Sequence, residues 1–165
     1  MLRHAFALEV KEGRTADFRG NLGKIWPELT AFLDAKKMVN FSMWNVERMV
    51  FGYYESDDDF TFTDADKEAV KAWEASYGDA YTWISTPFEE MRLMYHDFGI
   101  VRTSKELIRH RVFITKLVPG SEEEYKARHD VLVEARGDKV TIGPDSNFSI
   151  WNAGGYIFGY NEIDT

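Results

Sequence analysis

The chain has 165 residues, which is room for one ordinary domain or two small ones. Its 20 Lys and Arg against 28 Asp and Glu give a net charge of −8, which argues against nucleic acid as a partner because phosphate binding needs clustered positive charge. There is no cysteine, so disulfides, thiolate metal sites and a cysteine nucleophile are excluded. No apolar run approaches the roughly 18–20 residues of a membrane span, and the first residues lack the pattern of a secretory signal, so we expect a cytoplasmic protein. Aromatic residues make up 15% of the chain, which predicts a heavy core or a pocket for a ring-shaped ligand.

The first hundred residues predict alternating strands and helices. Apolar spacing indicates strands at 2–10, 39–45, 48–55 and 89–98 and helices at 13–37 and 66–77, the second continuing irregularly towards Trp83. Thr15 is the expected N-cap of the first helix, and Pro27 predicts a break within that helix. The order β-α-β-β-α-β is that of a ferredoxin-like α+β fold.

The sequence also repeats at a constant offset of 107 residues. Residues 40–45 (NFSMWN) recur at 147–152 as NFSIWN, and residues 51–55 (FGYYE) recur at 158–162 as FGYNE. We interpret this as a tandem duplication whose second copy is truncated to β-α-β-β. We therefore expect three segments in the chain: a complete repeat at 1–101, a linker at 102–107 and a truncated repeat at 108–165.

Two ferredoxin-like sheets can pack face to face, so we expect a dimeric α/β-barrel arrangement formed within the chain. The truncated copy would leave a sheet edge uncovered. A partner chain, a rearranged segment or additional residues must then cover this edge, and a homodimer is one of the expected assemblies.

Histidine is the side chain whose unperturbed pKa lies closest to neutrality, and the chain has four: His4, His96, His110 and His129. His129 follows Tyr125 by four residues on a predicted helix, so the two share a face suited to proton transfer with a hydroxylated ligand. A surface histidine on a charged helix is the alternative. No HxH or HxxxH spacing occurs, so we do not expect a dedicated metal site. Nucleotide-binding and serine-hydrolase motifs are also absent from the sequence, so those functions have no support.

Tryptophan and tyrosine rings stack well on the apolar faces of sugars. Trp26 and Trp73 lie on predicted helices near the expected cavity rim and are candidate ligand platforms, with core packing as the alternative. Trp44 and Trp151 occupy equivalent positions of the repeat and are expected in the core.

Residues 25–29 (IWPEL), with the preceding helix from Phe18, the strand containing Phe41, and Trp73 in VKAW, resemble the L-rhamnose mutarotase family over residues 1–100. The resemblance implies an enzyme without a cofactor that interconverts the α and β anomers of a 6-deoxy or related aldose by acid/base ring opening. Its implied partner is a small sugar. Family members are similar in having a helix Tyr and His four residues apart, a strand Tyr and a Trp pair on the second helix.

The resemblance implies that these family positions are divided between the two copies. In the first copy the helix Tyr and His become Phe18 and Leu22, and in the second they are kept as Tyr125 and His129. His129 is therefore the implied catalytic residue. The implied substrate-binding residues are Tyr125, Phe148, Trp73, Trp26, Phe41 and Phe18, with Glu74 following Trp73 where the family has a second Trp.

Two alternatives stay open beside the mutarotase. Replacement of the family's Tyr and His in the first copy favours a non-catalytic carbohydrate-binding or structural relative. A different small-molecule enzyme on the same fold, such as a monooxygenase or dehydratase, is the other alternative, because fold alone does not determine chemistry.

Overall fold

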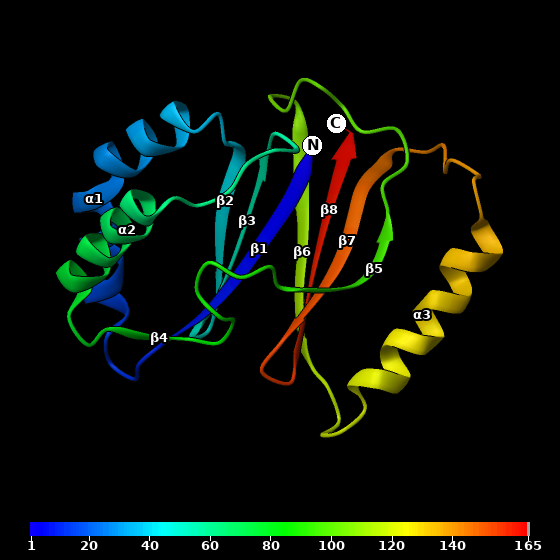
Figure 1. Cartoon of the computed structure of the whole chain (residues 1–165). Coiled ribbons are helices and arrows are strands. Elements are labelled where there is room, and N and C mark those ends of the chain that lie inside the picture. The colour runs from blue at the N-terminus through cyan, green and yellow to red at the C-terminus, as the bar shows by residue number, and fades with distance from the viewer. Residues whose placement is uncertain (165) are drawn as a thin grey trace. The chain divides into compact units, whose positions relative to one another are not determined.

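The computed structural model describes residues 1–164, which form eight strands and three helices (Figure 1). In chain order these are β1 (Leu2–Val10), α1 (Thr15–Ala35), β2 (Val39–Val46), β3 (Met49–Ser56), α2 (Asp64–Tyr77), β4 (Tyr81–Trp83), β5 (Arg92–Asp97), β6 (Ile108–Lys116), α3 (Glu122–Arg136), β7 (Asp145–Ala153) and β8 (Tyr156–Asp164). They divide into two compact units, Met1–Glu90 and Met91–Thr165. Each unit contains one four-stranded antiparallel sheet, so the expected α+β class and ferredoxin-like repeat are confirmed. Thr165, the last residue of the expected second repeat, lies outside the described residues.

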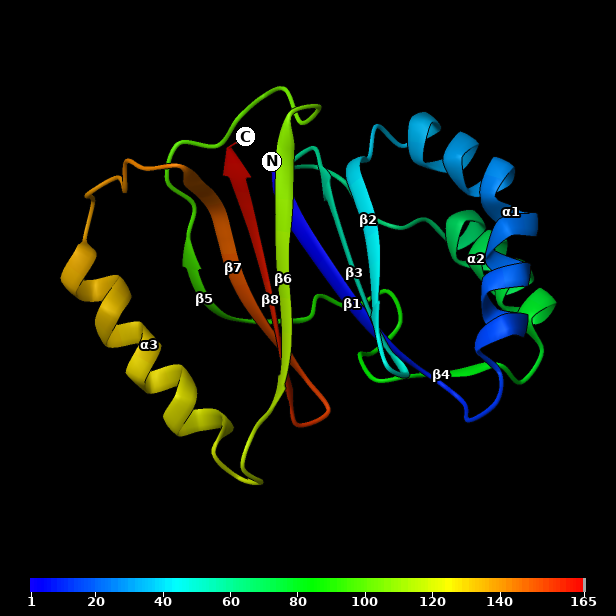
Figure 2. The same cartoon turned by 180° about the vertical axis from the view of Figure 1, so that it is seen from behind.

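In the first unit the sheet has the strand order β2-β3-β1-β4, and α1 and α2 lie side by side on one of its faces (Figures 1 and 2). The core under these helices contains Leu8, Val10, Phe18, Val50 and Tyr77. Strand residues with even numbers in β1 point to this face because side chains alternate along a strand. The helices and this strand face therefore enclose an apolar interior.

Helix α1 continues through Pro27 from Thr15 to Ala35, so the predicted break is wrong. Pro27 has no N–H and leaves the carbonyl of Gly23 without its helical partner, but both residues are exposed, so water can satisfy that carbonyl. Apolar residues on both sides of the proline, among them Leu33, face the sheet and hold the helix together. The N-cap is Arg14 and not Thr15, which is the first helical residue.

Helix α2 begins two residues earlier than expected because Thr63 and Asp66 form a capping box. The Thr63 side chain accepts from the Asp66 N–H at 3.3 Å, and the Asp66 carboxylate accepts from the Thr63 N–H at 2.9 Å. The helix ends at Tyr77, and the expected irregular continuation is the short strand β4, which pairs with the end of β1 through Leu8 and Trp83.

The expected last strand of the first repeat forms as β5, but it pairs with β7 in the second sheet, whose order is β5-β7-β8-β6. A rearranged segment thus covers the β7 edge of the truncated copy. The compact units divide between Glu90 and Met91, one strand earlier than the expected repeat boundary. The boundaries 1–101, 102–107 and 108–165 stay a prediction about the repeats.

Neither sheet closes on itself. Each keeps two edge strands, β2 and β4 in the first and β5 and β6 in the second, within the described residues 1–164. The expected barrel is therefore not formed by strand pairing, because the short β4 ends the first sheet and β5 ends the second.

The offset of 107 residues extends from the sequence to the strand register. Strands β1 and β3 pair in the same register, moved by 107, as β6 and β8, and both β2–β3 and β7–β8 have a register shift at equivalent places. Asn40 and Asn147 lie within these shifts with φ of 55° and 52°, a conformation that asparagine adopts more readily than most residues. Gly13 and Gly120, before the helices, both have positive φ as well. Tandem duplication stays our interpretation of this correspondence.

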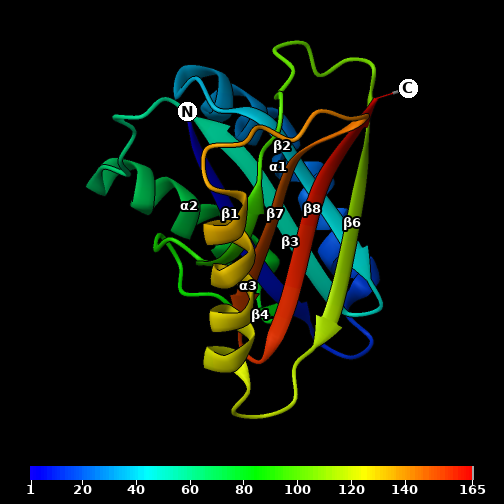
Figure 3. The same cartoon turned by 90° about the vertical axis from the view of Figure 1, so that its right-hand side faces the viewer.

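In the second unit α3 lies beside β5 and away from β6 (Figures 1 and 3). With one helix on this sheet, Phe113 of β6 is 38% exposed, whereas its counterpart Phe6 is half-buried beneath the helices of the first unit. Trp151 is buried as expected, and Trp44 is half-buried against Phe51. No helix in residues 1–164 is long and apolar enough to cross a membrane.

Candidate functional site

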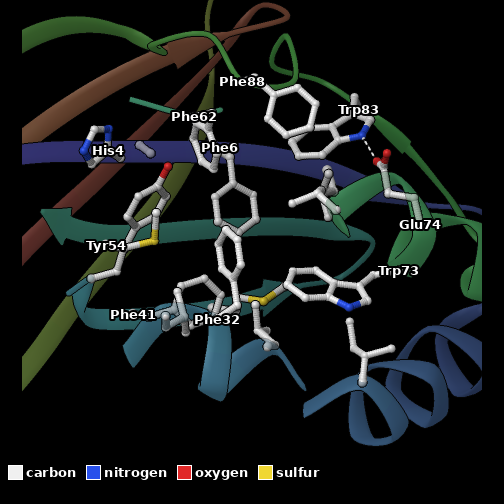
Figure 4. A pocket seen from close by; sticks show the side chains of 18 of the residues that line it. His4, Phe6, Phe32, Phe41, Tyr54, Phe62, Trp73, Glu74, Trp83 and Phe88 are labelled. Atoms are coloured by element: carbon white, nitrogen blue, oxygen red, sulfur yellow. Dashed lines mark hydrogen bonds between the residues drawn. The ribbon is translucent and has the colours of Figure 1, made fainter. Parts of the chain in front are cut away.

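A cavity of about 180 Å³ lies in the first unit between the sheet and helices α1 and α2 (Figure 4). Most of its wall is apolar or aromatic, and the rings that line it include Phe6, Phe18, Phe32, Phe41, Phe62, Trp73, Trp83 and Phe88. Part of the high aromatic content of the sequence is thus explained by the side chains that line this cavity. This is the common composition of a small-molecule site, in which apolar surface is combined with a few polar groups.

Three of the predicted site residues meet in this cavity. Phe18, Phe41 and Trp73 all line it, and Leu22 lies beside them. The ring of Trp26 is 45% exposed and contacts Phe41 at a centroid distance of 6.4 Å, outside the cavity wall. None of these side chains has an ionisable group that transfers protons at neutral pH.

One polar end of the cavity is built around His4 on β1. Its Nδ1 lies 2.8 Å from a carboxylate oxygen of Glu90, and its Nε2 lies 2.7 Å from the Ser56 hydroxyl. The imidazole is only 5% exposed and is stacked on the Tyr54 ring at 4.6 Å. Burial, with a smaller contribution from the Glu90 charge, raises the pKa of Tyr54, which therefore remains a neutral phenol.

The opposite polar end is built around Glu74 on α2. Its Oε1 accepts hydrogen bonds from the Tyr81 hydroxyl at 2.9 Å and from the Trp83 indole N–H (Figure 4). Both donors lie on β4, the strand that the sequence did not predict. Burial, and then the hydrogen bond to Glu74, raises the pKa of Tyr81, so its hydroxyl keeps the proton that it donates.

The remaining predicted residues meet in the second unit, on the face of α3 that is turned towards the sheet. The rings of Tyr125 and His129 are 4.3 Å apart, and Phe148 on β7 lies 5.6 Å from Tyr95. His129 is half-buried and its Nδ1 lies 2.9 Å from the carbonyl oxygen of Tyr125. A carbonyl only accepts, so Nδ1 carries a proton and Nε2 is the nitrogen available for proton transfer.

Tyr95 is the residue of this second group that the sequence did not single out. It lies on β5, and its ring is 5.2 Å from that of His129. It was missed because β5 was assigned to the first repeat, whereas the strand pairs with β7. Burial raises the pKa of Tyr125, so at least one neutral phenol lies beside the imidazole.

Groups of three or more His, Asp or Glu side chains with the geometry of a metal site do not occur in residues 1–164.

Comparison with protein-family models identifies the relationship of the first unit. The model described as "L-rhamnose mutarotase" matches residues 3–96, which is more than half of the chain. The chain belongs to the L-rhamnose mutarotase family. The match contains all residues that line the cavity of the first unit and all of β5 except Asp97, and it ends before α3.

Among solved structures, the L-rhamnose mutarotase FA22100 from Formosa agariphila is similar to this family member at 15% sequence identity and a TM-score of 0.37. The similarity covers 54% of this chain and 98% of that one. A search of curated proteins gave no match.

Proposed function

We propose that this member of the L-rhamnose mutarotase family interconverts the α and β anomers of a 6-deoxy or related aldose, with His129 as the residue that transfers protons. The family match supports the class of reaction. The position of His129 between Tyr95 and Tyr125 supports the second unit as the site of the reaction. In the first unit the residues equivalent to Tyr125 and His129 are Phe18 and Leu22, which cannot exchange protons.

The reaction needs one base and one acid. A base removes the proton of the anomeric hydroxyl, the bond between C1 and the ring oxygen breaks, and an acid protonates that oxygen to give the open aldehyde. Rotation about the bond next to C1 and closure by the reverse steps give the other anomer, so no atom is gained or lost.

In this proposal the Nε2 of His129 exchanges the proton, since Nδ1 is held by the Tyr125 carbonyl. The Tyr95 and Tyr125 phenols orient the sugar hydroxyls, and Phe148 offers a ring to an apolar face of the sugar. Trp26, Trp73, Phe41 and Phe18 lie in the first unit, so sugar contacts at these residues belong to the second candidate below and not to this scheme. No cofactor enters this scheme, and a homodimer stays a prediction.

The test is anomer exchange followed by NMR on L-rhamnose and a panel of other 6-deoxy and related aldoses. Wild type should accelerate exchange, and His129→Ala should lower kcat by about 100-fold or more. Arg128→Ala, which removes an exposed neighbour paired with Glu124, is the matched control and should exchange normally. Wild type that leaves the uncatalysed rate unchanged for every sugar would contradict the proposal.

The second candidate is a carbohydrate-binding relative without exchange. It is favoured by the apolar side chains at Phe18, Leu22 and Phe41 in the matched region. Sugar binding that Trp73→Ala abolishes, with no acceleration of exchange by wild type, would support this candidate over the mutarotase.

A further inference from the structure

The cavity of the first unit has a charge composition that the proposed reaction does not use. Three glutamates, Glu74, Glu89 and Glu90, line it together with aromatic rings, and no lysine or arginine among residues 1–164 does so. The ammonium of Lys36 lies 5.9 Å from the Phe32 ring, but it is paired at 2.6 Å with the buried Asp66. The cavity is thus apolar and negatively charged.

The wall is poorly suited to a free sugar. A monosaccharide carries hydroxyls around its ring, and each of them loses its hydrogen bonds to water on entering an apolar site. The wall of this cavity offers Phe6, Leu22, Ile25, Phe41 and Met43 to those hydroxyls. An apolar ring gains contacts with the same side chains and loses no hydrogen bond.

The carboxylate of Glu74 is held in place at one end of this apolar space. Its hydrogen bonds from Tyr81 and Trp83 both end on Oε1. Among the described residues, Oε2 is left as an acceptor. Glu74 is half-buried, so a cation bound there is only partly screened by water. The nearby indoles of Trp73 and Trp83 also line the cavity, and aromatic faces attract cations.

We propose that this cavity binds a small amine with an apolar ring, as its protonated cation. The ring lies among the phenylalanine and tryptophan side chains, and the ammonium donates to Oε2 of Glu74. The net charge of −8 favours the approach of a cation and disfavours an anion of the same shape. This site lies in the first unit and is separate from the proposed reaction at His129.

The test is calorimetry of three compounds that share a phenylethyl frame and differ in charge: 2-phenylethylamine, 2-phenylethanol and phenylacetate. Wild type should bind the amine at least tenfold more tightly than the alcohol, and phenylacetate more weakly than both. An excess of L-rhamnose should not displace the amine. Equal affinities for amine and phenylacetate, or no binding of the amine at millimolar concentration, would overturn the proposal.

Variants locate the binding. Glu74→Gln keeps an oxygen acceptor for Trp83 and removes the charge, so amine affinity should fall about tenfold, to that of the alcohol. Glu68→Gln is the matched control on the same helix, because Glu68 is exposed and paired with Lys71, and it should bind the amine as wild type does. Leu22→Trp should fill the cavity and weaken both the amine and the alcohol at least tenfold.

Amine binding is measured directly and does not depend on anomer exchange. His129→Ala should bind 2-phenylethylamine with unchanged affinity. Wild type that binds the amine but does not accelerate anomer exchange would therefore count only against the proposed function. Wild type that accelerates exchange but does not bind the amine would count only against this inference. Amine binding that His129→Ala weakens tenfold would place the amine elsewhere and overturn it.

Discussion

The ring of Phe6 lies directly against Gly52 on the neighbouring strand. A Cβ added to Gly52 would stand 2.0 Å from Cζ of Phe6, closer than any packed carbon pair. Phe113 and Gly159 have the same relationship in the second unit, where the added Cβ would meet Cε1 of Phe113 at 2.0 Å. A Cβ at either position therefore fits only if the ring across the strand moves.

The two glycines should differ in their tolerance of alanine. Phe6 packs between Phe41 and Trp83, so Gly52→Ala forces a packed ring to move and should cost about 1–3 kcal/mol in urea unfolding. Gly159→Ala should cost about 0.5 kcal/mol or less, because the more exposed Phe113 can turn away.

A rescue variant checks the cause of this difference. Phe6→Leu in the Gly52→Ala background removes the obstructing ring atoms and should recover part of the loss. Equal costs for the two glycine substitutions would mean that ring packing does not decide their effect.

Asp66 should link the stability of the protein to pH. Burial by itself raises the pKa of this carboxyl, but the Lys36 ammonium and the Thr63 donors outweigh burial and hold the pKa below its usual value. The folded pKa lies below the unfolded value of about 3.9, so the stabilisation is complete above that pH and is lost as the pH falls through the folded pKa. Asp66→Asn should cost about 2 kcal/mol at pH 7 and little in strong acid.

Denaturant unfolding of both proteins between pH 2 and 7 measures this effect. Asp64→Asn is the matched control, because Asp64 is exposed in the same helical turn and its nearest cation, Lys67, is 4.0 Å away. An Asp66→Asn penalty that stays constant down to pH 2 would argue against the linkage.

Lys105 should be essential to the second unit. Glu162 is fully buried, and the Lys105 ammonium lies 2.7 Å from one of its oxygens. Burial by itself raises the pKa of Glu162, but the hydrogen bonds from Lys105, Asn147 and Tyr160 outweigh burial. The net effect is a pKa below the usual value, so the carboxyl is charged. Lys105→Met removes the cation from a buried carboxylate and should cost about 3 kcal/mol or more.

Thermal and urea unfolding report the cost of that substitution. Adding Glu162→Gln should restore part of the stability because the uncompensated charge is then gone. Lys71→Met, at an exposed pair with Glu68, should change stability by less than about 0.5 kcal/mol. If Lys105→Met is as mild as Lys71→Met, the buried pair does not contribute as we expect.

Tyr95→Phe tests the residue that the second unit receives through β5. The substitution keeps the ring beside His129 and Phe148 and removes only the hydroxyl. Under the proposed function it should lower kcat/KM for anomer exchange about tenfold, the effect of one lost hydrogen bond. Tyr156→Phe on β8 is the matched control, and exchange unaffected by either substitution would remove Tyr95 from the proposed site.

Much of the fold was predictable because its signals are local. The alternating residues of β1, the hairpin of β2 and β3, and the helical spacing around Phe18 all led to elements within two residues of those observed. The repeat at an offset of 107 added the second unit, since its strands follow the same pattern.

The rest depended on long-range pairing that local patterns do not contain. The sequence shows that Arg92–Asp97 is a strand but not which sheet takes it, and Tyr95 was therefore missed. The same limit hid β4, a strand too short to have a pattern of its own, and with it the two donors that hold Glu74.

The candidate site was predictable only as two sets of residues. Spacing along a helix placed Tyr125 beside His129, and the structure has their rings 4.3 Å apart. The polar ends of the first cavity, at His4 and Glu74, were not predicted. His4 meets Glu90, which is 86 residues away along the chain, and Glu74 is held by donors on β4, the strand that the sequence did not predict.

The passage of β5 into the second sheet also constrains how such a protein can change over evolution. A sequence exchange at the repeat boundary, near residue 107, would remove from the second unit the strand that lines His129 with Tyr95. Recombination that preserves both units must instead cut between Glu90 and Met91. Under our interpretation of a tandem duplication, the duplicated segment and the compact unit are different segments of this chain, so a mutation in β5 changes the sheet of the second unit.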